Sequence, residues 1–326
     1  MNVFVGVDLG GTNIKAGIVD IDAGKVLSHQ SVPTMAREGH AAVMARMADL
    51  ILTVIQAAGR DQSQVKAVGV SAPGVLDMEK GLVLFLPNLP GNWPKVPLQS
   101  TIVEKTGLPT FLLNDVRAIT YGEWLYGAGR GVDTMACFAV GTGIGGGLVI
   151  NGKLHLGIGG TAGELGHQTI DFNGPECGCG NRGCLEAFAS GPAIAAMGVK
   201  AVMQGRNTII GELVNYDLNK ITPKIINDAA QQGDMVAKDI YDQAGTYIGV
   251  GVANVLVSVG PRKVVIAGGV SSAGNLLLDP IRRAIRERVT IMPVDQVEVV
   301  KASLGSDAGV LGVACWASQC LTGRMS

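Results

Sequence analysis

The chain is poor in aromatic residues and carries almost no net charge. Phe, Trp and Tyr make up 4% of the 326 residues, and the formal net charge is −1 at pH 7. A chain this close to neutral has no bulk electrostatic attraction to nucleic acid or to an acidic membrane, so we expect neither as a partner. The most apolar stretch, residues 248–259, contains glycines and is shorter than the roughly 20 residues that span a bilayer. No basic segment precedes the first apolar run, so we expect no signal peptide and a cytoplasmic location.

Two common nucleotide-binding motifs are also missing. The chain has no G-x-x-x-x-G-K-[ST] sequence, which excludes a P-loop. Residues 141–146 satisfy G-x-G-x-x-G, but the dinucleotide-binding motif requires a helix directly after its glycines. Here an apolar run and then Asn151-Gly152, a strong hairpin signal, follow instead. These glycines are therefore predicted to form a turn between strands.

Glycine and aliphatic residues, in contrast, are abundant. The chain has 47 glycines and is 47% hydrophobic, a composition typical of a compact α/β enzyme with more than one domain. Two glycine-rich stretches, residues 5–27 and 138–154, resemble each other, and each predicts strand, glycine turn, strand, turn, strand. The backbone N–H groups of a glycine turn can close on an anion because no side chain is in the way. Two such turns suggest two lobes that hold one polyphosphate.

Periodicity predicts the order of the other elements. In the first part of the chain it predicts a helix at 40–58, a strand at 65–70, a loop at 84–97, a helix at 98–106, a strand at 110–113 and a helix at 115–126. In the second part it predicts strands within 134–156, helices at 191–204, 222–231 and 233–256, a strand at 263–267, a helix at 276–289, a strand at 296–301 and a helix at 307–322. We expect the last helix to return to the first lobe. The small lobe then comprises residues 1–118 plus 305–326, and the large lobe residues 119–304.

Asp115 is the leading candidate for a catalytic residue. Asn114-Asp115 lies where a predicted strand ends and a helix begins, a position from which a carboxylate can project into a cleft. The alternative is that the aspartate only caps the helix. A carboxylate there could act as a general base that accepts the proton of an attacking hydroxyl.

A second constellation has the composition of a metal site. His167 is followed by Cys177, Cys179 and Cys184, so that three thiolates and one imidazole could hold a zinc ion. A disulfide would leave one of these cysteines over. With four protein ligands the ion is structural and has no open coordination position. The other cysteines, at 137, 315 and 320, are expected to be ordinary buried or partly exposed thiols.

Two further features could contribute to binding. Glu164 and Glu186 flank the predicted zinc loop, which would fix both if they reach the same ligand; otherwise they are surface carboxylates. Gly268-Gly269 follow a buried strand, where a flat base could lie against the backbone, although small residues there also form ordinary turns.

Taken together, these residues resemble the ROK family of sugar kinases and sugar-responsive repressors, and most of all its glucokinases. The likeness extends over nearly the whole chain, and the cysteine–histidine cluster with the stretch from Asp8 to Thr12 is specific to it. It implies an α/β, two-lobed hexokinase/actin/Hsp70-like ATPase fold with duplicated ribonuclease-H-like subdomains. It also implies ATP, Mg²⁺ and structural Zn²⁺ as cofactors, and a homodimer or higher homo-oligomer.

The resemblance assigns residues to each part of the site. The first phosphate loop would consist of Asp8, Gly10, Gly11, Thr12 and Lys15, with Asp8 near Mg²⁺. The second would consist of Gly141, Thr142, Gly143, Gly145 and Gly146, while Gly268 and Gly269 would border the adenosine. The sugar hydroxyls would be held by Gly74, Asn88, Asn114, Asp115, Glu164, His167 and Glu186. Asp115 would deprotonate the 6-hydroxyl, and His167 would serve both zinc and sugar through its two ring nitrogens.

The expected reaction is therefore transfer of phosphate from ATP to the 6-hydroxyl of a hexose, with glucose favoured. N-acetylmannosamine, N-acetylglucosamine, fructose, mannose and allose remain as alternative sugars, because the same polar residues would serve all of them. A sugar-sensing repressor is less favoured, since such relatives carry a DNA-binding segment before the first phosphate loop and only seven residues precede Asp8 here.

One residue departs from the family pattern. Many members read Asn-Asp-x-Asn-Ala at the base, whereas this chain has Arg117 in place of the second Asn. The cation could lower the pKa of the base, touch phosphate, or point to solvent.

Overall fold

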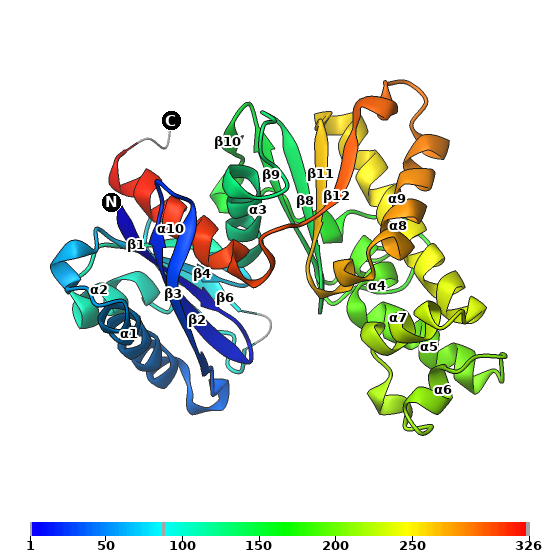
Figure 1. Ribbon diagram of the computed structural model, residues 1–326, viewed down its shortest axis with the longest axis horizontal. Coiled ribbons are helices and arrows are strands. Elements are labelled where there is room, and N and C mark those ends of the chain that lie inside the picture. Colours follow the sequence, from blue (N-terminus) through cyan, green and yellow to red (C-terminus); the bar gives the residue numbers. More distant parts are fainter. Residues whose placement is uncertain (1, 87–88, 324–326) are drawn as a thin grey trace. The chain divides into compact units, whose positions relative to one another are not determined.

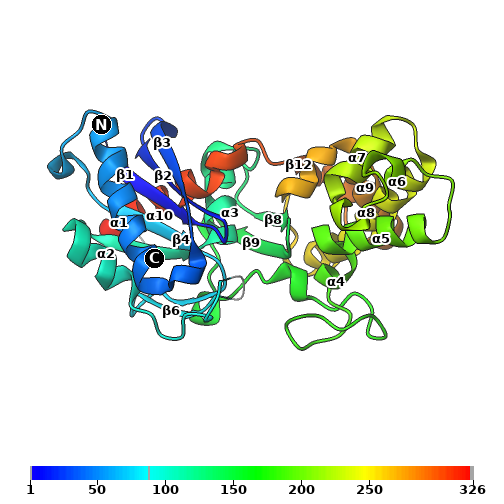
Figure 2. The same ribbon diagram turned by 90° about the horizontal axis from the view of Figure 1, so that it is seen from below.

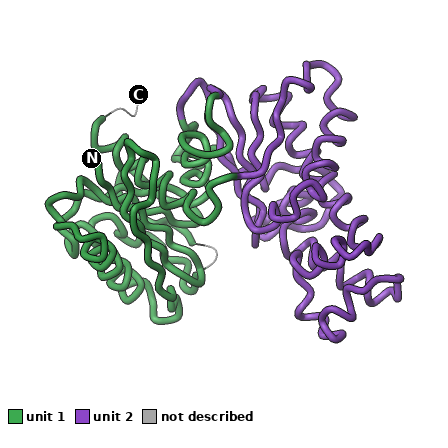
Figure 3. Tube along the Cα trace, in the orientation of Figure 1, with its two compact units in different colours: residues 1–131, 154–162, 303–326 green, residues 132–153, 163–302 purple. Residues whose placement is uncertain are grey.

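The computed structural model describes residues 2–86 and 89–323 (Figure 1). The chain divides into two compact units (Figure 3). Unit 1 comprises residues 1–131, 154–162 and 303–326, and unit 2 comprises residues 132–153 and 163–302. The chain therefore passes between the units after residues 131, 153, 162 and 302.

Unit 1 is built on a five-stranded sheet with the order β3-β2-β1-β4-β7. Its strands are β1 (Val3–Leu9), β2 (Asn13–Asp20), β3 (Lys25–Pro33), β4 (Val68–Ala72) and β7 (Thr110–Asn114). The first three are antiparallel, and β4 and β7 continue the sheet parallel to β1. A hairpin of β5 (Val75–Asp77) and β6 (Leu82–Phe85) follows β4.

Helices cover both faces of this sheet (Figures 1 and 2). They are α1 (His40–Ala57), α2 (Leu98–Thr106), α3 (Asp115–Tyr126) and α10 (Ala308–Leu321). Strand β1 shows how the alternation of side chains serves the two faces. Val3, Val5 and Val7 belong to the core that α1 and α2 close, whereas Phe4 packs with α10 on the other face. In the described part of the chain only α1 has the length and apolarity to cross a membrane, and its apolar face packs in this core.

Helices α3 and α10 pack with their backbones in contact. A β-carbon on Gly312 would lie 1.8 Å from the carbonyl oxygen of Ala118, and one on Gly122 would lie 2.4 Å from that of Ala308. No side chain other than hydrogen fits at either position. The whole of α3 therefore belongs to unit 1, which differs from the lobe limits at 118/119 and 304/305 expected from the sequence.

Unit 2 repeats the sheet of unit 1. Its order is β10-β9-β8-β11-β12, formed by β8 (Met135–Val140), β9 (Ile144–Ile150), β10 (Lys153–Leu154), β11 (Lys263–Ala267) and β12 (Glu298–Lys301). Strand β8 pairs antiparallel with β9 and parallel with β11, as β1 does with β2 and β4. The resemblance between the two glycine-rich stretches thus corresponds to a repeat of the sheet topology.

The helices of unit 2 form its single large core with the sheet. They are α4 (Leu185–Ala189), α5 (Gly191–Met203), α6 (Ile210–Leu213), α7 (Pro223–Gln231), α8 (Met235–Val259) and α9 (Asn275–Arg288). The core joins Phe138 and Ile266 of the sheet with Ile248 and Ile281 of α8 and α9.

Residues 154–162, which begin with the last residue of β10, belong to unit 1, and we call this segment the strap. Leu154 and Leu156 lie in an apolar cluster with Tyr121 and Trp316. From the sequence we expected these residues in the large lobe, because the pattern of apolar residues does not indicate which of the two units they pack on.

Candidate functional site

The first glycine loop connects β1 and β2 in unit 1, and a threonine stabilises it through two hydrogen bonds. The N–H of Gly10 donates to the carbonyl of Asn13 (3.0 Å), which closes the turn. Thr34 donates its hydroxyl to the carbonyl of Gly10 (2.7 Å) and its N–H to that of Thr12 (2.8 Å). Gly11 and Thr12 are exposed at the tip. Sequence reasoning missed Thr34, which follows a strand without any local sign of a role.

Asp8 stands at the end of β1 beside this loop. Ser71 at the end of β4 donates its hydroxyl to Asp8 Oδ1 (2.8 Å), and Lys15 lies directly opposite Asp8 on β2. Burial raises the pKa of Asp8, while the Ser71 hydrogen bond and the Lys15 charge act against that rise. The sequence pointed to Asp8 and Lys15 but not to Ser71.

Asn114 and Asp115 form the N-terminal end of α3. Asn114 is the cap, because its Oδ1 accepts from the N–H groups of Val116 (3.1 Å) and Arg117 (3.2 Å). Asp115 is the first helical residue, half-buried, and its Oδ1 accepts from the N–H of Val116 (2.8 Å). Since Asn114 caps the helix, Asp115 is not needed for that purpose.

The Asn114 side chain is also hydrogen-bonded to Gly74, a second predicted sugar ligand. Its Nδ2 donates to the carbonyl of Gly74 (3.2 Å), which turns the chain between β4 and β5 with φ of 77°. Asn88, a third candidate in this part of the chain, lies outside the described residues.

Arg117 does not point to solvent. It is 2% exposed, and its Nε and Nη2 both donate to the carbonyl of Ala162, at 2.9 and 2.7 Å. The cation therefore lies between the first turn of α3 and the end of the strap.

The second glycine loop connects β8 and β9 in unit 2. The N–H of Gly141 donates to the carbonyl of Gly143 (2.8 Å), so residues 141–143 form a tight turn in which Thr142 is exposed. Glu186 Oε2 accepts from the N–H of Ile144 (2.8 Å). A β-carbon on Gly143 would lie 2.3 Å from this same oxygen. Glu186 thus supports the loop, a role that the sequence did not suggest.

Gly145 and Gly146 belong to β9 rather than to the turn. They pair with Ala139 and Phe138 of β8, and a β-carbon on Gly146 would lie 2.4 Å from the Leu165 side chain. Their assignment to phosphate binding stays a prediction, because the structure shows only that protein atoms occupy the space beside Gly146.

Gly268 and Gly269 lie at the same edge of the sheet as the second glycine loop. Gly268 has φ of 83°, and a β-carbon there would lie 2.3 Å from the carbonyl oxygen of Val140, the last residue of β8. Both glycines are exposed. In sheets of parallel strands this carboxyl edge is where nucleotides bind.

The four predicted metal ligands lie together in unit 2. Their ligand atoms are all within 4.8 Å of one another. His167 Nδ1 is 3.7 Å from Cys177 Sγ, and Cys179 Sγ is 3.8 Å from Cys184 Sγ. Tetrahedral zinc with Zn–S bonds of about 2.3 Å needs ligand atoms about 3.8 Å apart, so the donor set fits zinc. Because Nδ1 of His167 faces the thiols, Nε2 is the nitrogen left for another ligand.

Burial affects the protonation of two thiols in the cluster. Burial raises the pKa of the Cys184 thiol to about 12 and raises that of Cys177 as well. Without a metal these two thiols stay protonated at neutral pH, whereas a bound ion would stabilise the thiolates. Glu186 Oε1 lies 3.9 Å from Cys177 Sγ, so Glu186 connects this cluster to the second glycine loop.

The segment that contains Glu164 and His167 packs closely on β9. Glu164 precedes a short 3-10 helix, Leu165–His167, and a β-carbon on Gly166 would lie 1.8 Å from the carbonyl oxygen of Ile144. Glu164 is exposed and His167 is half-buried. Unit 2 therefore brings His167, Glu186 and the second glycine loop into one neighbourhood.

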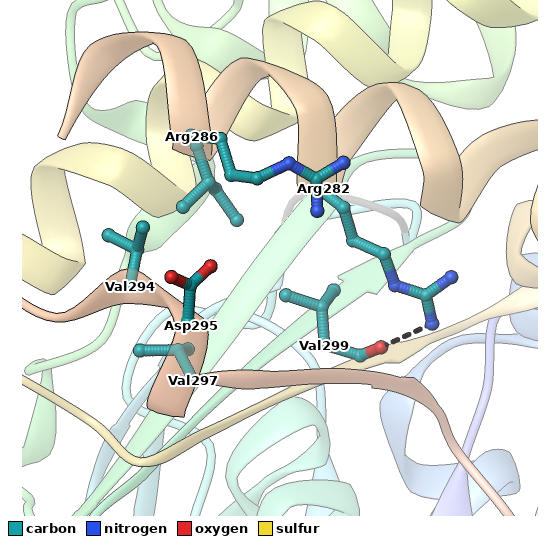
Figure 4. Close-up of a pocket in the computed structure, with 7 residues that line it drawn as sticks. Arg282, Arg286, Val294, Asp295, Val297 and Val299 are labelled. Carbon is teal, nitrogen blue, oxygen red and sulfur yellow. Dashed lines mark hydrogen bonds between the residues drawn. The ribbon is translucent and has the colours of Figure 1, made fainter.

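A separate pocket of unit 2 lies between α9 and the edge strand β12 (Figure 4). It is lined by Arg282, Ile285, Arg286, Val294, Asp295, Val297 and Val299. Arg282 donates to the carbonyl of Val299 (2.7 Å), and so occupies a backbone acceptor on the edge of the sheet. This arrangement protects the edge from pairing with another strand.

Two sheets of the same order, each with helices and a glycine turn after its first strand, define the actin/hexokinase-like ATPase fold, and the predicted fold class is confirmed. The family profile described as "ROK family" matches residues 4–320. The chain belongs to the ROK family, which confirms the resemblance read from its motifs.

The similar proteins include both glucokinases and xylose repressors. The glucokinase of Thermotoga maritima is 39% identical over 310 residues, covering 95% of each chain. A ROK family glucokinase of Streptomyces griseus, solved with glucose and AMPPNP, is 36% identical with a TM-score of 0.84, over 98% of this chain and 100% of that one. The xylose repressor of Caldicellulosiruptor bescii is 33% identical over 308 residues, which cover 94% of this chain and 76% of the repressor.

Proposed function

We propose that the protein is an ATP-dependent hexose kinase that phosphorylates the 6-hydroxyl, with glucose as its preferred substrate. The observation that carries the proposal is the combination, in one chain, of two glycine turns at equivalent places in two sheets with an aspartate at the start of α3. Similarity to the T. maritima and S. griseus glucokinases over nearly the full chain supports the same reaction.

The glycine turns would bind the triphosphate of ATP. The backbone N–H groups of residues 11–12 and 142–143 are the proposed donors to the phosphates, because those of Gly10 and Gly141 close the turns. Gly268 and Gly269 would border the adenosine, and the space beside Gly269 is open. Asp8, which accepts a hydrogen bond from Ser71 and lies opposite Lys15 in the sheet, is the carboxylate suited to the Mg²⁺ of MgATP. The ion would neutralise charge on the transferred phosphate.

Asp115 would act on the sugar as the general base. In phosphoryl transfer the protein mainly aligns the reactants and stabilises charge, so the task of Asp115 is to orient the 6-hydroxyl and accept its proton. Asn114 and Gly74 of unit 1, and Glu164, His167 and Glu186 of unit 2, are the proposed ligands of the sugar hydroxyls. His167 would use Nε2, since Nδ1 faces Cys177.

We also propose that His167, Cys177, Cys179 and Cys184 hold a structural zinc ion. Cys184 is the residue directly before α4, and Glu186 lies in the first turn of that helix. Zinc would therefore tie the segment that ends at His167 to the start of α4, and so fix two sugar ligands together.

Substrate and mechanism are tested by two experiments. In a coupled ADP-release assay with hexoses and N-acetylhexosamines, we expect glucose to give the highest kcat/KM. Asp115→Asn should lower kcat by about 10²–10⁴-fold and leave the glucose Kd nearly unchanged, because the variant keeps its shape but loses the base. Asp49→Asn, at an exposed position of α1, is the matched control and should keep full activity. An active Asp115→Asn enzyme would remove Asp115 from the mechanism.

The same assay separates the alternatives. A higher kcat/KM with N-acetylmannosamine, N-acetylglucosamine, fructose, mannose or allose would change the substrate and keep the reaction. The similarity to xylose repressors makes a sugar-sensing regulator the second candidate, and it predicts sugar binding without ADP release. We further expect a homodimer or higher homo-oligomer, which light scattering after size-exclusion chromatography measures directly.

A further inference from the structure

Arg117 is a buried cation on the helix that begins with Asp115. It is 2% exposed, and arginine is almost never this buried unless its guanidinium is hydrogen-bonded. Two of its donors, Nε and Nη2, converge on one acceptor, the carbonyl oxygen of Ala162. A planar guanidinium holding one carbonyl through two N–H groups fixes direction as well as distance.

Ala162 is the last residue of the strap, which contacts unit 1 at several points. The N–H of Ala162 donates to the carbonyl of Leu156 (2.9 Å), which closes the strap on itself. Gly160 packs closely on Met78, the residue that follows β5, since a β-carbon on Gly160 would lie 2.5 Å from the Cε of Met78. Leu156 packs in the cluster around Trp316. Arg117 therefore anchors the end of a segment that also contacts unit 1 at Leu156 and Gly160.

The anchored carbonyl comes just before a proposed sugar ligand. Glu164 follows Ala162 by two residues, and two peptide units span at most about 7 Å. Fixing the carbonyl of Ala162 thus restricts where the backbone of Glu164 can lie. In the same turn of α3, Asn114 holds the carbonyl of Gly74, another proposed sugar ligand.

We propose that Arg117 is a positioning residue for the sugar site, one that ties the peptide leading to Glu164 to the helix that carries Asp115. This inference rests on the proposed hexose-kinase function and adds a residue that departs from the common Asn-Asp-x-Asn-Ala pattern. Arg117 acts through the peptide that it holds and takes no part in the proton transfer.

A purely electrostatic role makes a different prediction. A cation that lowered the pKa of Asp115 would control the acid limb of the pH profile of kcat, and its removal would move that limb to higher pH. A positioning role changes the affinity for the sugar instead, and leaves the acid limb and the KM for ATP in place.

The test uses two substitutions of Arg117 and one control on the same helix. Arg117→Met keeps an unbranched apolar side chain without the donors, and Arg117→Lys keeps the charge without the paired N–H groups. The control is Glu123→Gln, because Glu123 is 0% exposed and accepts from the N–H groups of Ala128, Ser303 and Leu304. It reports what the loss of a buried charge does to stability without touching the strap.

We expect Arg117→Met to raise both the KM and the calorimetric Kd for glucose about tenfold, with the KM for ATP and the acid limb unchanged. The glucose KM and Kd of Arg117→Lys should lie between those of Arg117→Met and the wild type. Glu123→Gln should lower the Tm but keep the glucose KM of the wild type. An unchanged glucose Kd in Arg117→Met, an equal rise in Glu123→Gln, or a shifted acid limb at constant KM would each overturn the proposal. If Arg117→Met does not fold, the glucose Kd of Arg117→Lys decides. Wild-type protein that releases no ADP with any sugar overturns the kinase function, whereas the glucose Kd values still test Arg117.

Discussion

The variant Cys179→Ser tests the proposed zinc ion without disturbing the packing of the residues around it. Of the four proposed ligands Cys179 is the exposed one, whereas Cys177 is 8% and Cys184 0% exposed. Serine at this position therefore removes a thiolate without opening a cavity in the core. Its hydroxyl stays protonated at neutral pH and is a poor substitute for the sulfur that stands 3.8 Å from Cys184 Sγ.

The expected loss follows from the number of ligands. Structural zinc sites contribute about 10–16 kcal/mol of binding free energy in small domains, so one ligand of four accounts for roughly 3 kcal/mol. This corresponds to about 10²-fold in zinc affinity. Because the loop also carries His167 and Glu186, weaker zinc binding should lower the affinity for glucose as well as the Tm.

The assay combines metal analysis with thermal unfolding. We expect about one zinc per chain in the wild type and a loss of zinc from Cys179→Ser during dialysis against a chelator, with a lower Tm. Cys320→Ser is the control, because Cys320 lies in unit 1 and outside the cluster. A Cys179→Ser protein with full zinc content and unchanged Tm, or a zinc-free wild type of full stability and activity, would refute the reasoning.

Two further predictions concern the stability of the two units. Gly312→Ala should destabilise the protein by about 3 kcal/mol or more in urea unfolding, because its β-carbon would meet the Ala118 carbonyl oxygen at 1.8 Å. Gly269→Ala is the control and should have little effect, because the space beside Gly269 is open. Equal stability of both variants would contradict the close packing of α3 on α10. Asp234→Ala should cost about 1–2 kcal/mol at pH 7, since Asp234 caps α8. Burial opposes ionisation of Asp234, but hydrogen bonds from Thr208 and backbone N–H groups lower its pKa below 3.8. Its contribution is thus complete above pH 3.8 and is lost as the pH falls through the folded-state pKa, so a difference in unfolding free energy that stays constant down to pH 2 would count against this assignment.

Much of the fold could be predicted because its signals are local. The glycine turns at 10–12 and 141–143, with alternating strands on both sides, predicted the repeated half of each sheet. The hairpin of β5 and β6 was missed, because strands of three and four residues give too short an alternation to detect. The strap was assigned to the other lobe, since Leu154 and Leu156 pack on residues far away in the sequence.

The candidate site shows the same division. His167, Cys177, Cys179 and Cys184 fall within 18 residues, and their spacing alone predicted a metal set whose atoms do lie together. Asp115 was predicted from a strand-to-helix junction. The question of whether it caps α3 could be answered only by the structure, in which Asn114 is the cap.

The sequence by itself thus determined the repeated architecture, the family and the set of predicted metal ligands, because turns, strand alternation and ligand spacing are encoded over short stretches of chain. Only the tertiary structure decided which residues support the site. Ser71 reaches Asp8 across 63 residues, Arg117 reaches Ala162 across 45, and Glu186 reaches Ile144 across 42. Hydrogen bonds of this kind form where the ends of strands and helices meet in space, and nothing in the neighbouring sequence marks the partner in advance.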